Sequence, residues 1–366
     1  MADDGAANAL QERSQTSRAR GRLTRRLADI VCLPETSVSP QERWMTADIL
    51  DELLKSADLE LKKKVATRLA KQAAAPRSLL LRLASDSFEV AEPILRWSQA
   101  LSDFDMMELV PRVEHPHQVT LARREQISET VSAVLCHTGN TEAILALLRN
   151  EGARLSNQTI DFLVRQGIDD DVIARRLVKR PEMRPRQAFS LFWSVDHDLR
   201  RLVLERFAAS RLILQEAAED VFPIAANEGE QDAAVKEALA YIDRRQRNRA
   251  LNDSSALGGL EGIIERAGRE GLSVELRMQA ADIVNIRLDL FNQIVDDTGG
   301  EAVAILAKAT GLSRSHFEEL IACAQHVDNE TRLTQGNLIF DLVAVDKAQT
   351  VLRYWNWLSV RLNASN

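Results

Sequence analysis

Hydrophobic and polar positions repeat at a nearly fixed interval through the middle of the chain. In each copy an apolar residue precedes a residue that favours a helix start, and an apolar pair lies seven and eight positions after that second residue. The four copies are Leu101-Ser102 with Leu109-Val110, Ile127-Ser128 with Leu135-Cys136, Leu155-Ser156 with Leu163-Val164, and Met183-Arg184 with Leu191-Phe192. They begin at residues 101, 127, 155 and 183, so the intervals are 26, 28 and 28 residues. A fixed period of this size is typical of a helical solenoid, which predicts stacked helix pairs here.

The residues at the expected helix starts indicate the same phase independently. Ser102, Ser128 and Ser156 are suited to be N-caps, because a serine hydroxyl accepts a hydrogen bond from an otherwise unpaired backbone N–H. Pro185 and, one period before Ser102, Pro76 suit the first helical position, since proline has no N–H to leave unpaired. We therefore expect a helix to begin at each of these residues.

The N-terminal part divides into an arm and the beginning of the helical array. Residues 1–40 are predicted to be a flexible basic arm leading into a first helix, and the arm either contacts an acidic partner or only aids solubility. From residue 41 to residue 224 we expect the helical-repeat array. Its first helix is predicted to bury Trp44, Ile49 and Leu53-Leu54, which have helical spacing.

The C-terminal part is predicted to be a separate helical subdomain. Residues 225–258 read as a connecting helix and loops, and residues 259–366 as the subdomain. The pair formed by an apolar residue and a helix-starting serine recurs there at Leu272-Ser273 and Leu312-Ser313. The last helix carries Trp355 among other apolar residues, so it either docks onto the body or offers a partner site.

Composition supports an all-α fold in a reducing compartment. The 366 residues are 45% hydrophobic and only 5% aromatic, and helix-forming residues dominate. The net charge of -7 disfavours a general nucleic-acid binder, because non-specific affinity comes from neutralising phosphates. Three distant cysteines, of which Cys136 is expected in the core, do not suggest a disulfide framework. No apolar run is long enough to span a bilayer, so we expect a cytoplasmic protein.

The sequence offers no catalytic constellation. It lacks a nucleophile elbow and a phosphate-binding glycine loop, and the acidic pair Asp296-Asp297 is adequately explained by a helix end. His115 and His117 are the only close histidine pair, and we expect them in an exposed turn without a metal. His197 is isolated in sequence. We therefore predict no enzyme activity, no catalytic residues, no metal and no cofactor.

A basic residue recurs at the end of the first helix of each predicted pair. Stacking would align these cations as a basic ridge: Arg96, Arg123, Arg124, Arg149, Lys179, Arg180 and Arg206. Two explanations are open. The cations either complement the carbonyl end of each helix or form an anion-binding surface for an acidic protein, a phosphorylated partner or nucleic acid.

Several stretches resemble an uncharacterised family of helical-repeat proteins found mainly in alphaproteobacteria. The resembling stretches are Ala75-Pro76-Arg77, Phe88-Glu89-Val90-Ala91-Glu92-Pro93-Ile94-Leu95, Leu121-Ala122-Arg123-Arg124, Asn150-Glu151-Gly152-Ala153-Arg154-Leu155-Ser156, Lys179-Arg180-Pro181-Glu182-Met183 and Gly299-Gly300-Glu301-Ala302. They extend over about residues 75–360. The resemblance implies a HEAT-like α-solenoid and supplies no activity, since the family is a domain of unknown function.

These observations favour a non-enzymatic scaffold or regulatory adaptor for another protein, in bacterial signalling. Solenoids commonly bind partners on their concave surface. One alternative is a HEAT-like nucleic-acid-binding protein, including the base-excision type, with Trp97 and Trp193 as the only candidates to stack on a base. The other is a small-molecule sensor with a pocket near residues 225–258. The sequence does not specify the oligomeric state.

Overall fold

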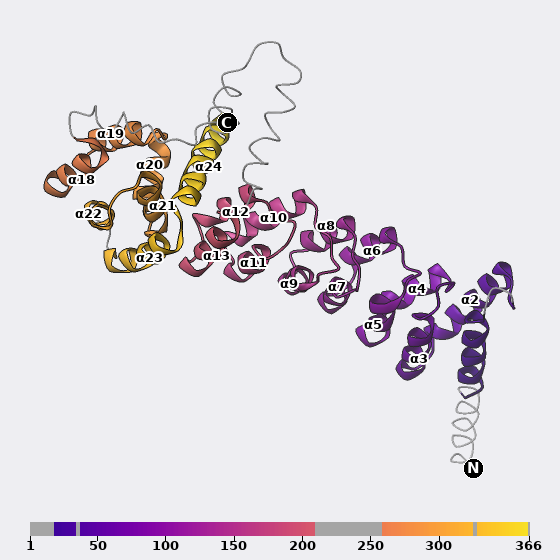
Figure 1. Cartoon of the computed structure of the whole chain (residues 1–366). Helices are drawn as coiled ribbons and strands as arrows, with labels where there is room; N and C mark the ends of the chain where they lie inside the picture. The colour runs from indigo at the N-terminus through magenta and orange to yellow at the C-terminus, as the bar shows by residue number, and fades with distance from the viewer. Residues whose placement is uncertain (1–17, 34–36, 209–257, 325–327, 365–366) are drawn as a thin grey trace, which may run out of the picture. The chain divides into compact units, whose positions relative to one another are not determined.

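The computed structural model describes residues 18–33, 37–208, 258–324 and 328–364, and these residues are helical or connect helices (Figure 1). The only β-type pairing within these ranges is an isolated parallel bridge between Ile127 and Ala153. The chain forms two compact units, residues 1–163 and 164–366, and the division falls within α10 (Asn157–Gly167). The predicted connecting segment 225–258 lies outside the described residues, apart from Gly258.

The helices of the first unit pack in two rows. Residues 18–31 are helical and precede the following elements: α2 (Pro40–Lys55), α3 (Leu59–Leu69), α4 (Arg77–Ala84), α5 (Phe88–Trp97), α6 (Asp103–Leu109), the short 3-10 helix η1 (Val110–Arg112), α7 (His115–Ala122), α8 (Glu129–His137) and α9 (Thr141–Arg149). Each even-numbered helix from α2 to α8 contacts the next even-numbered one, and α3, α5, α7 and α9 do the same (Figure 1). Consecutive helices such as α4 and α5 join the two rows.

Four of the five predicted helix starts are confirmed, and the fifth is displaced by one residue. Ser102 accepts from the backbone N–H of Asp105 before α6, and Ser128 accepts from that of Val131 before α8. Ser156 accepts from the backbone N–H of Thr159 at a distance of 3.2 Å. Pro185 opens α12 (Pro185–Phe192). Pro76 is displaced by one residue from its predicted place, because it is the N-cap of α4.

The repeated apolar positions point into the core. Leu109 is 4% exposed, and Leu135, Leu163 and Leu191 are 0% exposed. Cys136 is also fully buried, as predicted. The recurring apolar pair therefore marks the face that each of these helices buries.

The apolar stripe predicted for the first helix is partly wrong for α2: Leu54 is fully buried as predicted, but Trp44 and Ile49 are not. Trp44 and Ile49 are 60% and 53% exposed, and the helix instead buries a stripe that includes Arg43 and Leu50. Arg43 is buried because its guanidinium donates to the backbone carbonyls of Val31 and Leu33. A backbone partner satisfies the charged group, so a polar residue takes the position that periodicity assigns to an apolar one.

The second unit is built around one buried helix. Its other elements are α11 (Asp171–Leu177), α12, α13 (His197–Phe207), α18 (Gly259–Glu270), α19 (Val274–Val284), α20 (Leu288–Val295), α22 (Arg314–Cys323), α23 (Asn329–Leu342) and α24 (Val345–Ala364). The central helix, α21 (Glu301–Thr310), contacts α13, α20, α22, α23 and α24. Every residue of α21 except Lys308 and Thr310 is buried. An apolar surface on all sides explains its central place.

The last helix docks onto the second unit, as one of the two predicted options states. Trp355 packs against Phe189, Phe192 and Trp193, with ring centroids 5.0–6.0 Å apart. Tyr354 is fully buried beside Phe189. None of the described helices has the length and apolar character needed to cross a membrane.

Candidate functional site

The ends of α5, α7 and α9 lie next to one another in the first unit. Arg124, just after α7, donates to the backbone oxygens of Leu95 and Ser98 at 2.5 Å and 2.6 Å. Leu95 is in the last turn of α5, and Ser98 is its C-cap. The guanidinium therefore satisfies carbonyls that the end of α5 leaves unpaired.

The same contact recurs one period later. Asn150, which follows α9, donates to the backbone oxygens of Ala122 and Arg124 at 3.0 Å and 2.6 Å. In the second unit Arg206 donates to the backbone oxygens of Val178 and Arg180, after α11. Donor and acceptor are separated by 26–29 residues in all three cases. Burial lowers the pKa of Arg124 and that of Arg206.

The predicted basic ridge thus contains two kinds of residue. Arg124 and Arg206 are partly buried and engaged with carbonyls, and Arg180 is 4% exposed and pairs with Glu182 at 2.7 Å. The exposed members are Arg96, Arg123, Arg149 and Lys179. Only the exposed members have guanidinium or ammonium groups free to meet a partner.

Three exposed arginines share one edge of the first unit, which we call the arginine edge: Arg96, Arg123 and Arg149. None of them forms an ion pair with a described carboxylate, and Arg96 lies over the ring of Trp97 at 4.8 Å. Arg123 and Arg149 line a surface hollow of about 480 Å³ together with Glu142 and Asn150. The structure therefore brings neighbouring cations of the predicted ridge into one concave surface.

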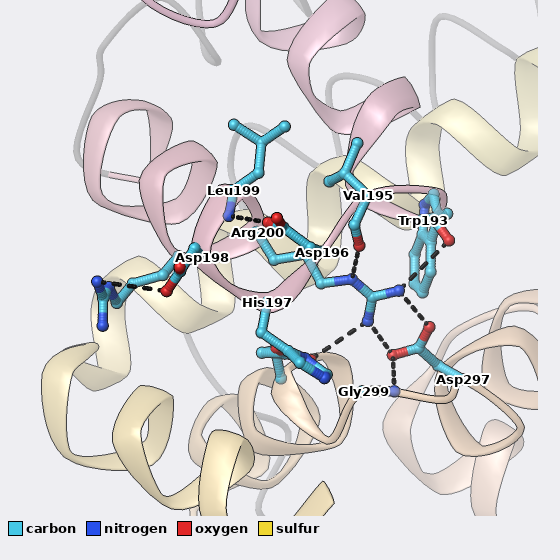
Figure 2. A network of polar contacts seen from close by, with 11 residues as sticks. Trp193, Val195, Asp196, His197, Asp198, Leu199, Arg200, Asp297 and Gly299 are labelled. Atoms are coloured by element: carbon cyan, nitrogen blue, oxygen red, sulfur yellow. Dashed lines mark hydrogen bonds and ion pairs between the residues drawn. The ribbon is translucent and has the colours of Figure 1, made fainter. Parts of the chain in front are cut away.

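A second polar constellation is buried in the other unit, where α13 meets the turn before α21 (Figure 2). Arg200 is 3% exposed and donates to both carboxylate oxygens of Asp297, at 2.6 Å and 3.0 Å. Its remaining N–H groups reach Glu301 Oε2 at 3.2 Å and the backbone oxygens of Val195 and Trp193. All five guanidinium donors are thus satisfied.

The acidic partners are fixed by their own contacts. Asp297 Oδ2 accepts from the backbone N–H of Gly299 at 3.1 Å. Glu301 is 1% exposed, and its Oε1 lies 2.6 Å from Nδ1 of His197. Since the carboxylate only accepts, the ring nitrogen is the donor in this contact. Glu301 opens α21, where a carboxylate also complements the helix dipole.

Arg332 of α23 completes what we call the buried charge cluster, in which Arg200, Asp297, Glu301 and Arg332 are buried and His197 is partly exposed. Arg332 is 1% exposed and donates to the backbone oxygen of Val295 at 2.8 Å. Burial lowers the pKa of Arg332, and the nearby Asp297, Asp296 and Glu301 act in the opposite direction. A Cβ built at Gly300, where φ is +97°, would lie 2.0 Å from the Arg332 carbonyl oxygen. Glycine is therefore required for this close approach.

The cluster is suited to hold elements together. Two arginines and two carboxylates balance in charge, and each contacts protein groups, whereas Nε of Arg332 is buried without a hydrogen-bond partner. Such a group stabilises the arrangement of α13, α21 and α23. Within the described ranges, no group of three His, Cys, Asp or Glu residues could hold a metal ion.

The histidine pair is placed differently from the prediction. His115 and His117 lie in α7, and His117 is buried at 3% exposure instead of lying in an exposed turn. Its Nε2 is 3.0 Å from the backbone oxygen of Asp86, and its ring packs edge-on against Phe88.

Burial raises the pKa of the Cys136 thiol to about 12, so little of the reactive thiolate exists near neutral pH.

Residues 90–353 match the model of a family described as an uncharacterised protein conserved in bacteria (DUF2336). The match covers well over half of the chain. The chain belongs to the DUF2336 family. Comparison with curated proteins and comparison with solved structures each gave no match.

The DUF2336 region contains both constellations described above. The arginine edge and the buried charge cluster fall within residues 90–353, whereas residues 18–31, α2 and α3 precede it. The cluster is not among the features predicted from the sequence, although Gly299-Gly300-Glu301-Ala302 is one of the resembling stretches. The doubled glycine before a carboxylate was the available signal for a close backbone approach.

Proposed function

We propose that this DUF2336 protein is a non-enzymatic scaffold for another protein, built as a HEAT-like α-solenoid of stacked helix pairs. The two rows formed by α2 to α8 and by α3 to α9 support this architecture. Contacts that join successive helix ends, with donor and acceptor 26–29 residues apart, support it further. Bacterial signalling is the setting we propose for the scaffold.

The observation that carries the proposal is the arginine edge. Arg96, Arg123 and Arg149 end three successive helices of one row, are exposed and have no carboxylate partner among the described residues. A guanidinium binds carboxylate and phosphate oxygens in a planar, bidentate geometry. The partner is therefore an acidic or phosphorylated segment of another protein that lies along this edge.

The other ridge residues contribute less to binding in this proposal. The guanidinium of Arg124 already donates to a backbone oxygen at the end of α5, and that of Arg206 donates to one after α11. The two explanations left open by the sequence thus apply to different residues: helix-end pairing to Arg124 and Arg206, and partner binding to the arginine edge.

The test is a matched pair of charge-reversal variants. The edge variant carries Arg96→Glu, Arg123→Glu and Arg149→Glu, and the control carries Arg22→Glu, Arg25→Glu and Arg26→Glu, with the same change in net charge. Fluorescence anisotropy with a labelled oligoglutamate peptide and with a phosphoserine peptide reports binding. We expect wild type and control to bind one of these peptides and the edge variant to lose most of that binding.

The same proteins then serve as bait in native lysate. A partner retained by wild type and control and lost from the edge variant supports the proposal. Equal capture by all three proteins, with no difference in peptide binding, contradicts a binding role for the arginine edge.

A nucleic-acid-binding function is the second candidate, because Trp97 is 59% exposed beside Arg96. An exposed ring next to a cation suits stacking on a base. Trp193, however, packs against Phe192 and Trp355, so only Trp97 of the two candidate tryptophans supports this alternative. An electrophoretic mobility shift at low and high salt separates the candidates, since phosphate binding weakens steeply with salt. The proposed sensor pocket near residues 225–258 lies outside the described residues.

A further inference from the structure

We propose that the helix formed by residues 18–31, together with α3, forms a surface that binds anionic lipid bilayers. This basic surface lies outside the family region and uses none of the residues of the arginine edge. It would attach the protein to a membrane face without crossing it. The proposal goes beyond the scaffold function and does not depend on it.

The helix at residues 18–31 is held against the first unit by specific contacts. Thr24, Ala28 and Val31 are 0–3% exposed and form its buried stripe. A Cβ built at Gly21 would lie 3.9 Å from the side chain of Leu61 in α3. Asp29 forms an ion pair with Arg68, also in α3. The two helices therefore present one combined surface.

That surface concentrates positive charge on an acidic protein. The chain as a whole has a net charge of -7, yet the helix at 18–31 has five arginines and a single carboxylate. Seven exposed cations of the combined surface have no ion-pair partner among the described residues: Arg18, Arg20, Arg22, Arg25, Arg26, Lys64 and Lys71. Lys64 and Lys71 line a hollow of about 540 Å³ along α3. Clustered, unneutralised cations of this number are suited to an anionic leaflet.

Exposed aliphatic side chains accompany these cations. Leu23, Ile30 and Leu33 are 46%, 37% and 42% exposed. At 100° per residue, Arg26 lies opposite the buried stripe, and Ile30 and Leu23 lie about 40° and 60° from Arg26 on the exposed side of the helix. Basic residues next to an exposed aliphatic stripe are typical of helices that lie in the interface of a membrane.

The residue types favour lipid over nucleic acid as the occupant. Residues 18–33 contain no aromatic side chain, and surfaces that bind single strands use aromatic rings as stacking platforms. Moving aliphatic groups from water into the acyl region of a bilayer lowers the free energy. A phosphate backbone offers no comparable apolar environment. Charge attracts the protein to the surface, and the aliphatic side chains then add affinity.

The test is co-sedimentation of the full chain with vesicles. One preparation contains equal parts of phosphatidylglycerol and phosphatidylcholine, and the other contains phosphatidylcholine alone. Wild type is expected to bind the anionic vesicles, with weaker binding at high salt. It is not expected to bind the neutral vesicles. The variant with Arg22→Glu, Arg25→Glu and Arg26→Glu should bind about a hundredfold more weakly or worse, since each surface cation contributes roughly a fivefold gain.

Three further variants make the outcome decisive. A triple Arg→Gln variant at positions 22, 25 and 26 keeps helix-forming side chains and should also lose binding, with circular dichroism confirming the fold. Leu23→Ser with Ile30→Ser should leave weaker binding that high salt abolishes completely. The arginine-edge variant, with the same charge change as the triple Glu variant, should bind like wild type.

Several results would overturn the proposal. They are absence of binding to anionic vesicles, equal loss in the arginine-edge variant, and vesicle binding that the Leu23 and Ile30 changes leave unaltered. Binding to a DNA duplex or a single strand, in place of vesicles, assigns the basic surface to nucleic acid instead. The peptide-binding test of the scaffold function is independent of each of these results.

Discussion

At the scale of single residues, Asp105 shows how one side chain completes a helix start and links two helices. It accepts from Ser102, the N-cap of α6, and forms an ion pair with Arg77 at the start of α4. The residue is fully buried. Burial acts to raise the pKa of Asp105, but the hydrogen bonds from Ser102 and Arg77 outweigh it and lower the pKa. The ionised form is therefore the one that the folded protein stabilises.

This arrangement predicts a pH-dependent contribution to stability. A carboxyl group whose pKa is lower in the folded state stabilises the protein above the unfolded-state pKa of about 4, and the effect is lost as pH falls below it. We expect Asp105→Asn to lower the free energy of unfolding at about pH 7, and the gap from wild type to narrow by about pH 3. Urea unfolding at both pH values measures this difference in the free energy of unfolding. Asp103→Asn, at the exposed start of the same helix, is the control. A gap that is constant or wider in acid contradicts the prediction.

Residue-scale features could be predicted where they depend on neighbours in sequence. Ser102, Ser128 and Ser156 were identified as caps because a cap and its N–H partner are three residues apart. The burial of Arg43 could not be predicted, since its acceptors are backbone oxygens on a separate segment. For the same reason Trp44 was assigned to the core although it is exposed.

At the scale of helices, Arg124 joins α7 to the end of α5. Its side chain replaces water at the oxygens of Leu95 and Ser98, in a partly buried position. Arg124→Met keeps much of the side chain's length but leaves these carbonyls without their donor. We expect the free energy of unfolding to fall by about 1.5–3 kcal/mol, the usual range for hydrogen bonds to a charged group.

The neighbouring residue supplies the control for this prediction. Arg123 is exposed and has no ion-pair partner in the described part of the chain, so Arg123→Met should change stability by less than about 0.5 kcal/mol. Urea unfolding of both variants measures the difference. Equal stability of the two variants would show that the Arg124 contacts add nothing to folding.

At the scale of the whole molecule, the buried charge cluster joins segments that are far apart in sequence. Arg200 and Asp297 are separated by 97 residues, and His197 and Glu301 by 104. All of these residues belong to the second unit. Removing one member leaves a buried charge without a partner, which typically costs about 3–5 kcal/mol.

Hydrogen exchange should therefore localise the effect of Arg200→Met. We expect peptides from α13, α21 and α23 to exchange faster than in wild type, and peptides from α5 and α7 to be unchanged. Arg201→Met is the control, because Arg201 is exposed and its carboxylate neighbours lie on its own helix. Mass spectrometry of the three proteins provides the measurement. Unchanged exchange around Asp297 would contradict a stabilising role for the cluster.

The sequence predicted helices and the faces that several of them bury but not this cluster, for a physical reason. Leu109, Leu135 and Leu163 recur with a period, so their shared burial could be expected. His197 and Asp297 belong to no period, and each was explained locally, as an isolated histidine and a helix end. Only the folded chain shows that they approach the same arginine and glutamate.

The contacts between successive helix ends also bear on how proteins of this design change in length. Arg124 and Asn150 occupy equivalent places one period apart, and each meets acceptors that the preceding copy supplies. In the proposed solenoid, duplication or loss of one complete repeat would present these two donors with equivalent acceptors, whereas a shift of one residue would misalign them. Natural or designed proteins of this architecture should therefore differ in length by whole repeats.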